Sequence, residues 1–155
     1  MAPVVIVTGG SRGIGAATAR LAAQRGYDVC VNFVRNREAA ESVVADCRAS
    51  GVRAIFVQAD VAREEDVVRL FRTVDEQLGM VSALVNNAGI LERQMRVEAM
   101  DAGRIERVIA ANVIGSLLCC REAVCRMSTR HGGSGGAIVN VSSVAAPTGA
   151  TGEYV

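Results

Sequence analysis

Near the start of the chain stands Val4-Val5-Ile6-Val7-Thr8-Gly9-Gly10-Ser11-Arg12-Gly13-Ile14-Gly15, an apolar β-branched run that leads into a glycine-rich turn. A helix-like stretch, Ala16 to Arg25, follows the turn directly. A strand, a glycine turn and a helix in this order bring unpaired backbone N–H groups and the positive end of a helix to one point, which suits a pyrophosphate. The stretch therefore predicts a binding site for the phosphates of a dinucleotide.

The glycines of this turn have separate expected roles. By analogy with the dinucleotide fingerprint, Gly9 permits the tight turn, Gly13 lets phosphates approach the backbone, and Gly15 lets the helix pack closely on the strand. The spacing is TGxxxGxG, one residue wider than GxGxxG, and taken alone it also fits a plain β-α turn without a ligand. The residues that we predict to contact a cofactor here are Gly9, Ser11, Arg12, Gly13, Ile14 and Gly15.

Along the chain, apolar runs alternate with segments of helical periodicity, which indicates a repeated βα unit. We expect strands at 4–8, 29–33, 54–58, 83–86 and 137–142. We expect helices at 13–24, 37–49, 64–78 and 102–129, the last one long and partly at an interface. With right-handed crossovers this alternation predicts one α/β domain over 1–155, a Rossmann-type doubly wound parallel sheet in three αβα layers with strand order 3-2-1-4-5.

Composition narrows the class of protein further. Half of the residues are hydrophobic but only 3% are aromatic, which is typical of a Val-, Ala-, Ile- and Leu-filled parallel sheet. The formal net charge is +1, so we expect neither nucleic acid nor an anionic membrane as a partner. The first residues contain no basic segment with a long apolar run, so we expect no signal peptide.

The cysteines and the single histidine argue for a reduced protein without a metal. Five cysteines, an odd number without a CxxC pair, predict a cytoplasmic chain in which they are small apolar side chains. His131 lies beside Gly132-Gly133 with no partner at ligand spacing. We therefore expect no metal site.

Three later motifs follow the glycine turn in a fixed order: Asn86-Asn87-Ala88-Gly89, Asn112-Val113-Ile114-Gly115 and Ser142-Ser143. Together with TGxxxGxG they make the chain similar to the short-chain dehydrogenase/reductase family, over essentially its whole length. The resemblance implies a nicotinamide dinucleotide cofactor. It also implies that Asn86 steadies the central sheet and that Asn87, Ala88 and Gly89 lie on the cofactor side.

The resemblance assigns a further pair of residues to the adenine. Asp60 follows the third expected strand, where the family uses an acidic residue to bind the adenine amino group, and the backbone of Val61 contacts the ring. The competing role of Asp60 is an N-cap for the helix that begins near Glu64, although the spacing makes it early for that role.

The end of the second expected strand bears on the choice of cofactor. An NAD site normally has an Asp or Glu there for the ribose hydroxyls, and 29–37 contains none. Arg35 and Arg37 stand there instead, and Arg12 lies in the glycine turn; guanidinium groups suit a 2′-phosphate. NADP(H) is thus favoured over NAD(H), unless these arginines are ordinary solvated charges. Asn32 and Asn36 complete the cofactor residues predicted at this strand end.

For catalysis the resemblance implies a tetrad of Asn, Ser, Tyr and Lys. Asn112 matches the asparagine that extends the proton relay, and Ser143 matches the serine that bonds the substrate oxygen, with Ser142 as the second choice. Tyr154 stands only 11 residues after Ser143, and a lysine four residues later would fall beyond Val155. We therefore interpret Tyr154 as non-catalytic and expect the catalytic pair outside this sequence.

The sequence thus predicts an oxidoreductase that transfers a hydride between NADP(H) and a carbonyl or secondary alcohol of a small molecule. The alternative is a non-catalytic dinucleotide-binding module, which applies if the 155-residue chain is complete. A methyltransferase fits less well, because Asn86-Asn87-Ala88-Gly89 has no role there. Since family members continue beyond this point, we expect the front part of a longer reductase, with apolar surface left uncovered, and a homo-oligomer, tetramer or dimer.

Overall fold

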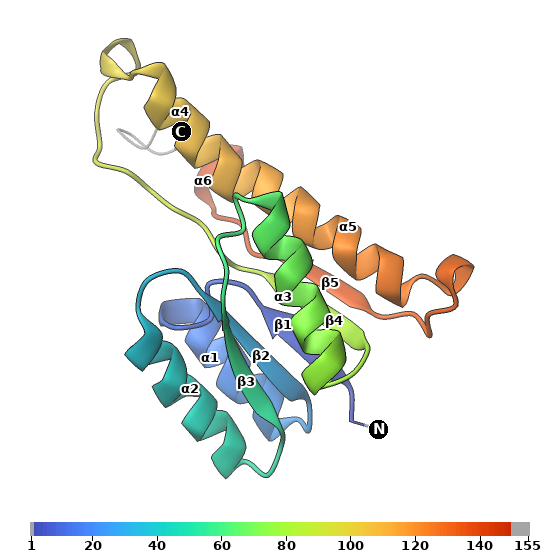
Figure 1. Ribbon diagram of the computed structural model, residues 1–155. Helices are drawn as coiled ribbons and strands as arrows, with labels where there is room; N and C mark the ends of the chain where they lie inside the picture. Colours follow the sequence, from blue (N-terminus) through green and yellow to red (C-terminus); the bar gives the residue numbers. More distant parts are fainter. Residues whose placement is uncertain (1, 150–155) are drawn as a thin grey trace.

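The computed structural model describes residues 2–149, which form a five-stranded parallel sheet with helices on both faces (Figure 1). The strand order is β3-β2-β1-β4-β5, which confirms the predicted order 3-2-1-4-5. The strands are β1 (Val4–Val7), β2 (Asp28–Phe33), β3 (Ala54–Gln58), β4 (Val81–Asn86) and β5 (Ala137–Asn140). The main helices are α1 (Gly13–Gln24), α2 (Arg37–Ala49), α3 (Glu64–Gln77), α4 (Ala102–Ile109) and α5 (Gly115–Met127). Shorter helical turns are η1 (Val97–Ala99), η2 (Ala110–Ile114), η3 (Thr129–His131) and α6 (Ala145–Thr148).

The central strand β1 is buried on both faces and divides the core in two. Because successive side chains of a strand point to opposite faces, Val5 and Val7 lie in the cluster under α1 and α2. Val4 and Ile6 lie in the cluster under α3 and α5. This arrangement explains why β1 reads as an unbroken apolar run rather than an alternating one.

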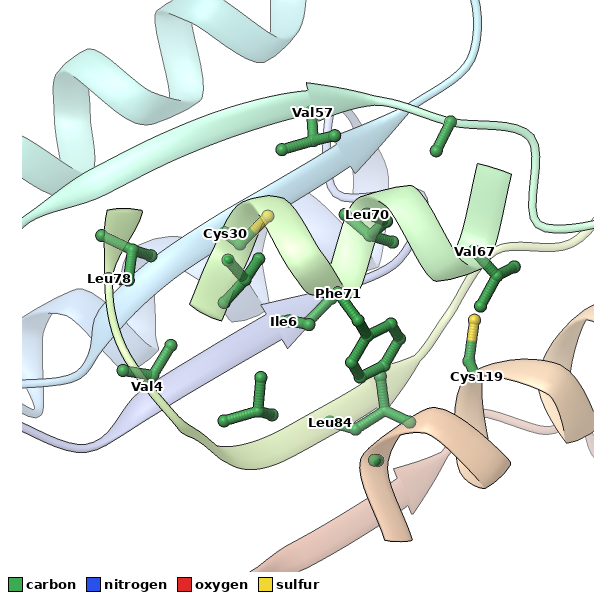
Figure 2. Packing of buried hydrophobic residues seen from close by; sticks show 14 of the residues in the cluster. Val4, Ile6, Cys30, Val57, Val67, Leu70, Phe71, Leu78, Leu84 and Cys119 are labelled. Atoms are coloured by element: carbon green, nitrogen blue, oxygen red, sulfur yellow. The ribbon is translucent and has the colours of Figure 1, made fainter. Parts of the chain in front are cut away.

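Helix α3 packs through the predicted stripe of apolar residues. Figure 2 shows Val67, Leu70 and Phe71 pointing from α3 toward the sheet, where Leu84 of β4 belongs to the same cluster. Cys119 joins this cluster from α5, and burial raises its pKa to about 12. The Cys119 thiol is therefore a packing group at neutral pH.

The parallel register brings the motifs to one edge of the sheet. Asn86 pairs with Asn140 at the last positions of β4 and β5, and Val7 of β1 pairs with Val85. The glycine turn, the Asn86–Gly89 segment and the residues after β5 consequently all leave the sheet at its carboxyl edge. In open α/β sheets this edge is where ligands bind.

Two predicted elements are wrong in part. The expected single helix at 102–129 is divided by the π-helical turn η2 (Ala110–Ile114) and ends at Met127, where Ser128 adopts an extended backbone. The expected strand at 137–142 ends at Asn140, so Ser142 and Ser143 lie in the connection that follows it. The other helices and strands match the expected ranges within two residues at each end.

The long helical stretch and β5 both leave apolar side chains uncovered, as the sequence predicts. Along α4, η2 and α5, Ile109, Val113 and Leu117 face outward, and Leu117 is 64% exposed. In β5, Ile138 packs against the cluster under α3 and α5, so Val139, which is 53% exposed, points to the other face of the sheet. Nothing within residues 2–149 covers these side chains.

By length and composition, Ala102–Met127 is the one helical stretch within residues 2–149 that could span a membrane. Its other side is packed: Cys119 and Met127 belong to the core. Arg126 Nε lies 2.7 Å from Asp75 Oδ2 of α3. These contacts are those of a helix in the outer layer of an α/β sheet.

At the opposite, amino edge of the sheet, one ion pair joins three elements. Asp28 of β2 is 3% exposed, and its Oδ2 accepts a 2.6 Å hydrogen bond from Arg53 Nη2. The Arg53 backbone N–H donates to Asp28 Oδ1, and Nη2 also donates to the Leu78 carbonyl at the end of α3. The pair therefore fixes the start of β3 against β2 and α3.

We expect Asp28→Asn to lower the free energy of unfolding by about 2 kcal/mol, because it weakens a buried, charge-assisted hydrogen-bond set. Urea denaturation of the 155-residue chain measures the loss. The matched control is Asp46→Asn, which breaks the exposed Arg20–Asp46 pair, 2.8 Å long, and should leave the midpoint unchanged within error. Equal losses in the two variants would contradict this account.

Candidate functional site: the carboxyl edge of the sheet

The Thr8 hydroxyl joins the two turns that the sequence analysis singled out. Thr8 is 1% exposed, and its Oγ1 accepts hydrogen bonds from the backbone N–H groups of Asn87 and Ala88, both at 3.0 Å. The same hydroxyl donates to the Val85 carbonyl at 3.3 Å. This role of Thr8 was not predicted from the sequence; the available signal was a hydroxyl residue at the end of β1, directly beside β4.

Asn87 strengthens this junction through its side chain. Its Nδ2 donates to the carbonyl oxygens of Thr8, at 2.9 Å, and Gly9, at 3.1 Å. The glycine turn and the Asn86–Gly89 segment are thus one hydrogen-bonded unit. Ala88 and Gly89, which follow, are held at a fixed distance from the glycine turn.

The three glycines of the turn differ in what surrounds them. A Cβ atom at Gly9 would lie 2.9 Å from the Ala88 Cα, and one at Gly15 would lie 2.5 Å from Asn87 Nδ2. Both positions therefore require glycine for close packing. Gly13 has a φ of +54°, yet a Cβ there would meet nothing within 4 Å. The space beside Gly13 is open, as the predicted approach of phosphates requires.

The start of α1 offers donors to an anion. Gly13 is the first residue of α1, and the side chain of the preceding Arg12 makes no capping hydrogen bond. The N–H groups of a first helical turn have no partner within the helix. Ser11 is half-buried beside them, and Ile14 is 65% exposed at the same end. The residues present fit a phosphate group.

Asn32 holds the glycine turn through its buried side chain. Its side chain is buried, its Oδ1 accepts a 3.2 Å hydrogen bond from the Gly9 N–H, and its Nδ2 donates to the Ala59 carbonyl at 2.8 Å. The Asn32 carbonyl also accepts from the Gly10 N–H at 2.8 Å. The amide is thus used inside the protein, where it positions the glycine turn and the end of β3.

The basic residues near the end of β2 fall into two groups. The side chains of Arg12 and Arg35 are exposed and form no hydrogen bond or ion pair with any other residue in 2–149, although the Arg12 backbone carbonyl accepts a hydrogen bond from the Ala16 N–H. Arg37, by contrast, bonds Glu41 at 2.8 Å and lies over the Phe56 ring at 5.0 Å. Two guanidinium groups are therefore available for a ligand, and the third is held by the protein.

Asn36 and Asp60 both stabilise backbone turns. Asn36 is the N-cap of α2 and accepts from the Ala39 N–H at 2.9 Å. Asp60 Oδ1 accepts from the Ala62 N–H at 3.0 Å, two residues ahead. The N-cap of α3 is Arg63, so the alternative role of Asp60 as the helix N-cap is wrong.

The Asp60 backbone is held in turn by the first turn of α3. Its N–H donates to Asp66 Oδ2 at 2.8 Å, and this hydrogen bond lowers the pKa of Asp66. Val61, the next residue, is buried against Gly115, where a Cβ atom would lie 2.9 Å from the Val61 carbonyl. Gly115 therefore lets the long helical stretch pass close to the segment that the resemblance assigns to the adenine.

Asn112 sits at the centre of the π-helical turn η2, in which the Gly115 N–H bonds the Ala110 carbonyl five residues back. Its side chain forms a two-bond pair with the backbone of Ile90: Oδ1 accepts from the Ile90 N–H at 2.8 Å and Nδ2 donates to the Ile90 carbonyl at 3.0 Å. The partner of this polar side chain is thus the segment after Gly89. π-turns of this kind are frequent at functional sites.

A second polar contact links Asn112 to the sheet. The Ser116 hydroxyl donates to the Asn112 carbonyl at 3.1 Å. Asn86, which is buried, donates from Nδ2 to the Ser116 carbonyl at 3.2 Å and to Asn140 Oδ1 at 2.9 Å. Asn86 thus ties β4 to β5 and to α5.

The serines lie at the same edge of the sheet. Ser142 and Ser143 are exposed in the connection between β5 and α6, and Ser143 Oγ accepts from the Ala145 N–H at 3.1 Å. Tyr154 lies outside the described residues. Within residues 2–149, no group of three or more His, Cys, Asp and Glu side chains is arranged to hold a metal ion.

These features define an α/β domain of the doubly wound, Rossmann type. A sequence model of the family described as short chain dehydrogenase matches residues 3–155. The chain belongs to the short-chain dehydrogenase/reductase family.

Relatives and solved structures agree with this assignment. The uncharacterized oxidoreductase YgfF of Escherichia coli is 54% identical over 152 residues, which are 98% of this chain and 62% of that protein. The 3-oxoacyl-(acyl-carrier-protein) reductase FabG of Staphylococcus aureus is 37% identical over 153 residues, which are 99% of this chain and 61% of that protein. A putative short-chain alcohol dehydrogenase from Sinorhizobium meliloti superposes with a TM-score of 0.89 at 30% identity, over 97% of this chain and 58% of that one. The chain thus spans about three fifths of the length of the curated relatives it matches.

We expect Thr8→Val to lower the free energy of unfolding by about 2 kcal/mol, because two backbone N–H groups lose their acceptor while the side-chain shape is kept. Thr8→Ser retains the hydroxyl and should lose about 1 kcal/mol, the value of one buried methyl group. Urea denaturation compares the two variants. A larger loss in the serine variant would show that the hydroxyl does not hold the turns together.

Proposed function

We propose that the whole protein is an oxidoreductase that transfers a hydride between NADP(H) and a carbonyl or secondary alcohol of a small organic substrate. The observation that carries the proposal is the open, uncapped start of α1 at Gly13, locked by Thr8 to the segment that ends in Gly89. A nicotinamide dinucleotide supplies the hydride when bound. The reductase activity in the name of FabG, whose 3-oxoacyl group contains a ketone, supports a carbonyl substrate.

Different residues of this chain would bind different parts of the dinucleotide. The N–H groups of the Gly13–Gly15 turn would donate to the pyrophosphate, favoured by the positive end of α1. Asp60, whose Oδ1 bonds Ala62 and whose backbone is fixed by Asp66, would present its carboxylate and the backbone of Val61 to the adenine. Ala88 and Gly89 would border the nicotinamide ribose.

The preference for NADP(H) rests on Arg12 and Arg35. Both are exposed and without a partner among the described residues, and no carboxylate occurs between Val29 and Arg37 to accept ribose hydroxyls. Guanidinium groups bind a phosphate with charge-assisted, bidentate hydrogen bonds. Arg37 is engaged by Glu41 and Phe56, so it contributes less.

For the chemical step, Ser143 would donate a hydrogen bond from its hydroxyl to the substrate oxygen and stabilise the charge that develops there. Asn112 would fix the Ile90 segment, and its backbone carbonyl, which already accepts a hydrogen bond from Ser116, would hold a water of the proton relay. A tyrosine and a lysine, which the family resemblance implies, would complete the relay. Tyr154 is not proposed as that tyrosine.

The uncovered apolar surface supports self-association. Ile109, Val113 and Leu117 line one side of the helical stretch 102–127, and a contiguous apolar surface of this kind is typical of an interface. We propose that the whole protein is a homo-oligomer, a dimer or tetramer, and that this face takes part in it.

We expect Arg12→Ala and Arg35→Ala each to weaken NADPH binding about tenfold, because a charge-assisted bond to the 2′-phosphate contributes about 1.5 kcal/mol or more. NADH binding should stay unchanged in both, and Arg37→Ala serves as the matched control. Titration followed by cofactor fluorescence measures the dissociation constants of the unaltered chain and of the three variants. Equal affinity of the unaltered chain for NADH and NADPH would overturn the proposed preference for NADP(H). If S-adenosylmethionine, and not NADPH, stabilises the chain against unfolding, the proposed hydride transfer is overturned.

We expect Ser143→Ala to lower kcat for carbonyl reduction by the complete protein by about 100-fold or more, the usual effect of losing a donor to a developing oxyanion. The dissociation constant for NADPH should not change. Ser142→Ala is the control and should keep kcat within a few fold, which NADPH absorbance reports. Dinucleotide binding without turnover on a panel of ketones and aldehydes would favour the non-catalytic binding module.

A further inference from the structure

The segment that follows Gly89 is tied to α4 through the Glu92 carboxylate and through the Arg93 backbone carbonyl. Glu92 receives two hydrogen bonds from Arg107, from Nε to Oε1 at 2.7 Å and from Nη2 to Oε2 at 3.0 Å. Glu92 Oε2 also lies 3.7 Å from Arg104 Nη1. A bidentate pair of this geometry fixes direction as well as distance.

Arg104 adds a buried hydrogen bond to this contact. Its side chain is only 5% exposed, and its Nη1 donates to the Arg93 carbonyl at 2.7 Å. The guanidinium thus bonds the backbone of the segment directly beside Glu92. Asp101, the N-cap of α4, accepts from the Arg104 N–H at 2.8 Å and fixes the helix start that carries both arginines.

A second tie lies two residues earlier in the same segment. Asn112 holds the Ile90 backbone by two hydrogen bonds, and a Cβ at Gly89 would lie 3.3 Å from Asn112 Oδ1. The path from Gly89 to Arg93 therefore runs along one helical stretch, with η2 at one end and the arginines of α4 at the other. If the arginine end is released, the hydrogen bonds that still hold Ile90 within residues 2–149 are those of the exposed amide pair with Asn112.

We propose that Glu92 is a positioning residue, which, through Arg104 and Arg107, sets the place of Gly89 and Ile90 against Asn112 at the nicotinamide end of the site. The inference rests on the proposed function for its catalytic consequence, but not for its structural one. Glu92 does not touch the reacting atoms; it acts through the backbone of its segment.

The same segment offers a matched control. Glu98 pairs with Arg96 in η1, but both side chains are largely exposed and neither bonds α4 within the described residues. Glu92→Gln and Glu98→Gln each remove one negative charge, the first from the pairs with Arg104 and Arg107 and the second from the pair with Arg96. They differ in whether the pair reaches α4.

The direct test is amide hydrogen exchange of the 155-residue chain. The Ile90 N–H is protected by Asn112, so Glu92→Gln should speed its exchange about tenfold by opening the segment locally. Glu98→Gln should leave it unchanged, and the urea midpoint should agree between the two variants. Arg107→Gln should reproduce the effect, and the double variant should add little to it, because the two residues form one contact. Equal exchange at Ile90 in Glu92→Gln and Glu98→Gln would overturn the proposal.

The catalytic consequence has a separate readout in the complete protein. Glu92→Gln should lower kcat about tenfold while the KM for NADPH stays constant, because misplacement of the nicotinamide side affects the chemical step and leaves the phosphate contacts intact. A parallel rise in the NADPH KM would overturn this role. If the unaltered protein neither binds nor oxidises NADPH, the proposed function fails, while the exchange experiment still decides whether Glu92 holds the segment.

Discussion

The carboxyl edge of this domain depends on one buried hydroxyl. Thr8 ends β1 and receives the N–H groups of Asn87 and Ala88, so two turns about 80 residues apart in sequence behave as one piece. The Asn87 side chain donates in turn to the carbonyl oxygens of Thr8 and Gly9. This amide fits beside α1 because Gly15 has no Cβ atom. The glycine turn can remain open at Gly13 because it is held so firmly elsewhere. A preformed anion site of this kind loses little conformational entropy on binding.

A second set of contacts connects this edge of the sheet to the helical stretch 102–127. Asn86 joins β4, β5 and Ser116; Ser116 contacts Asn112; and Asn112 holds Ile90. The π-helical turn places Asn112 where its amide can pair with a passing backbone. The apolar face on the other side of this stretch is uncovered, so the same element serves the site on one side and is available for association on the other.

Much of this arrangement could be predicted from sequence because its signals are local. The βα alternation and the right-handed crossover rule yielded the strand order, and the glycine turn, Asp60 and the Asn87–Gly89 segment were each predicted on the cofactor side. No role was predicted for Thr8, and Asn32 was predicted to contact the cofactor, whereas its buried amide holds the glycine turn and the end of β3. These hydrogen bonds depend on which polar atoms of distant strands meet, and that is decided by register. The π-turn around Asn112 was not predicted, because apolar residues stand on both sides of Asn112 in sequence and mark no change in the type of helix. The Glu92 contact was missed for a related reason: its partners lie 12 and 15 residues away, across an irregular segment.

The central claim is that the glycine turn, the Thr8-linked segment and the two unpartnered arginines form one dinucleotide site. A crystal structure of the protein with NADP⁺ tests it most directly. We predict the pyrophosphate against the Gly13–Gly15 N–H groups, the 2′-phosphate between Arg12 and Arg35, and the nicotinamide ribose beside Ala88 and Gly89. A dinucleotide bound elsewhere, or a 2′-phosphate directed into solvent away from both arginines, would contradict the account.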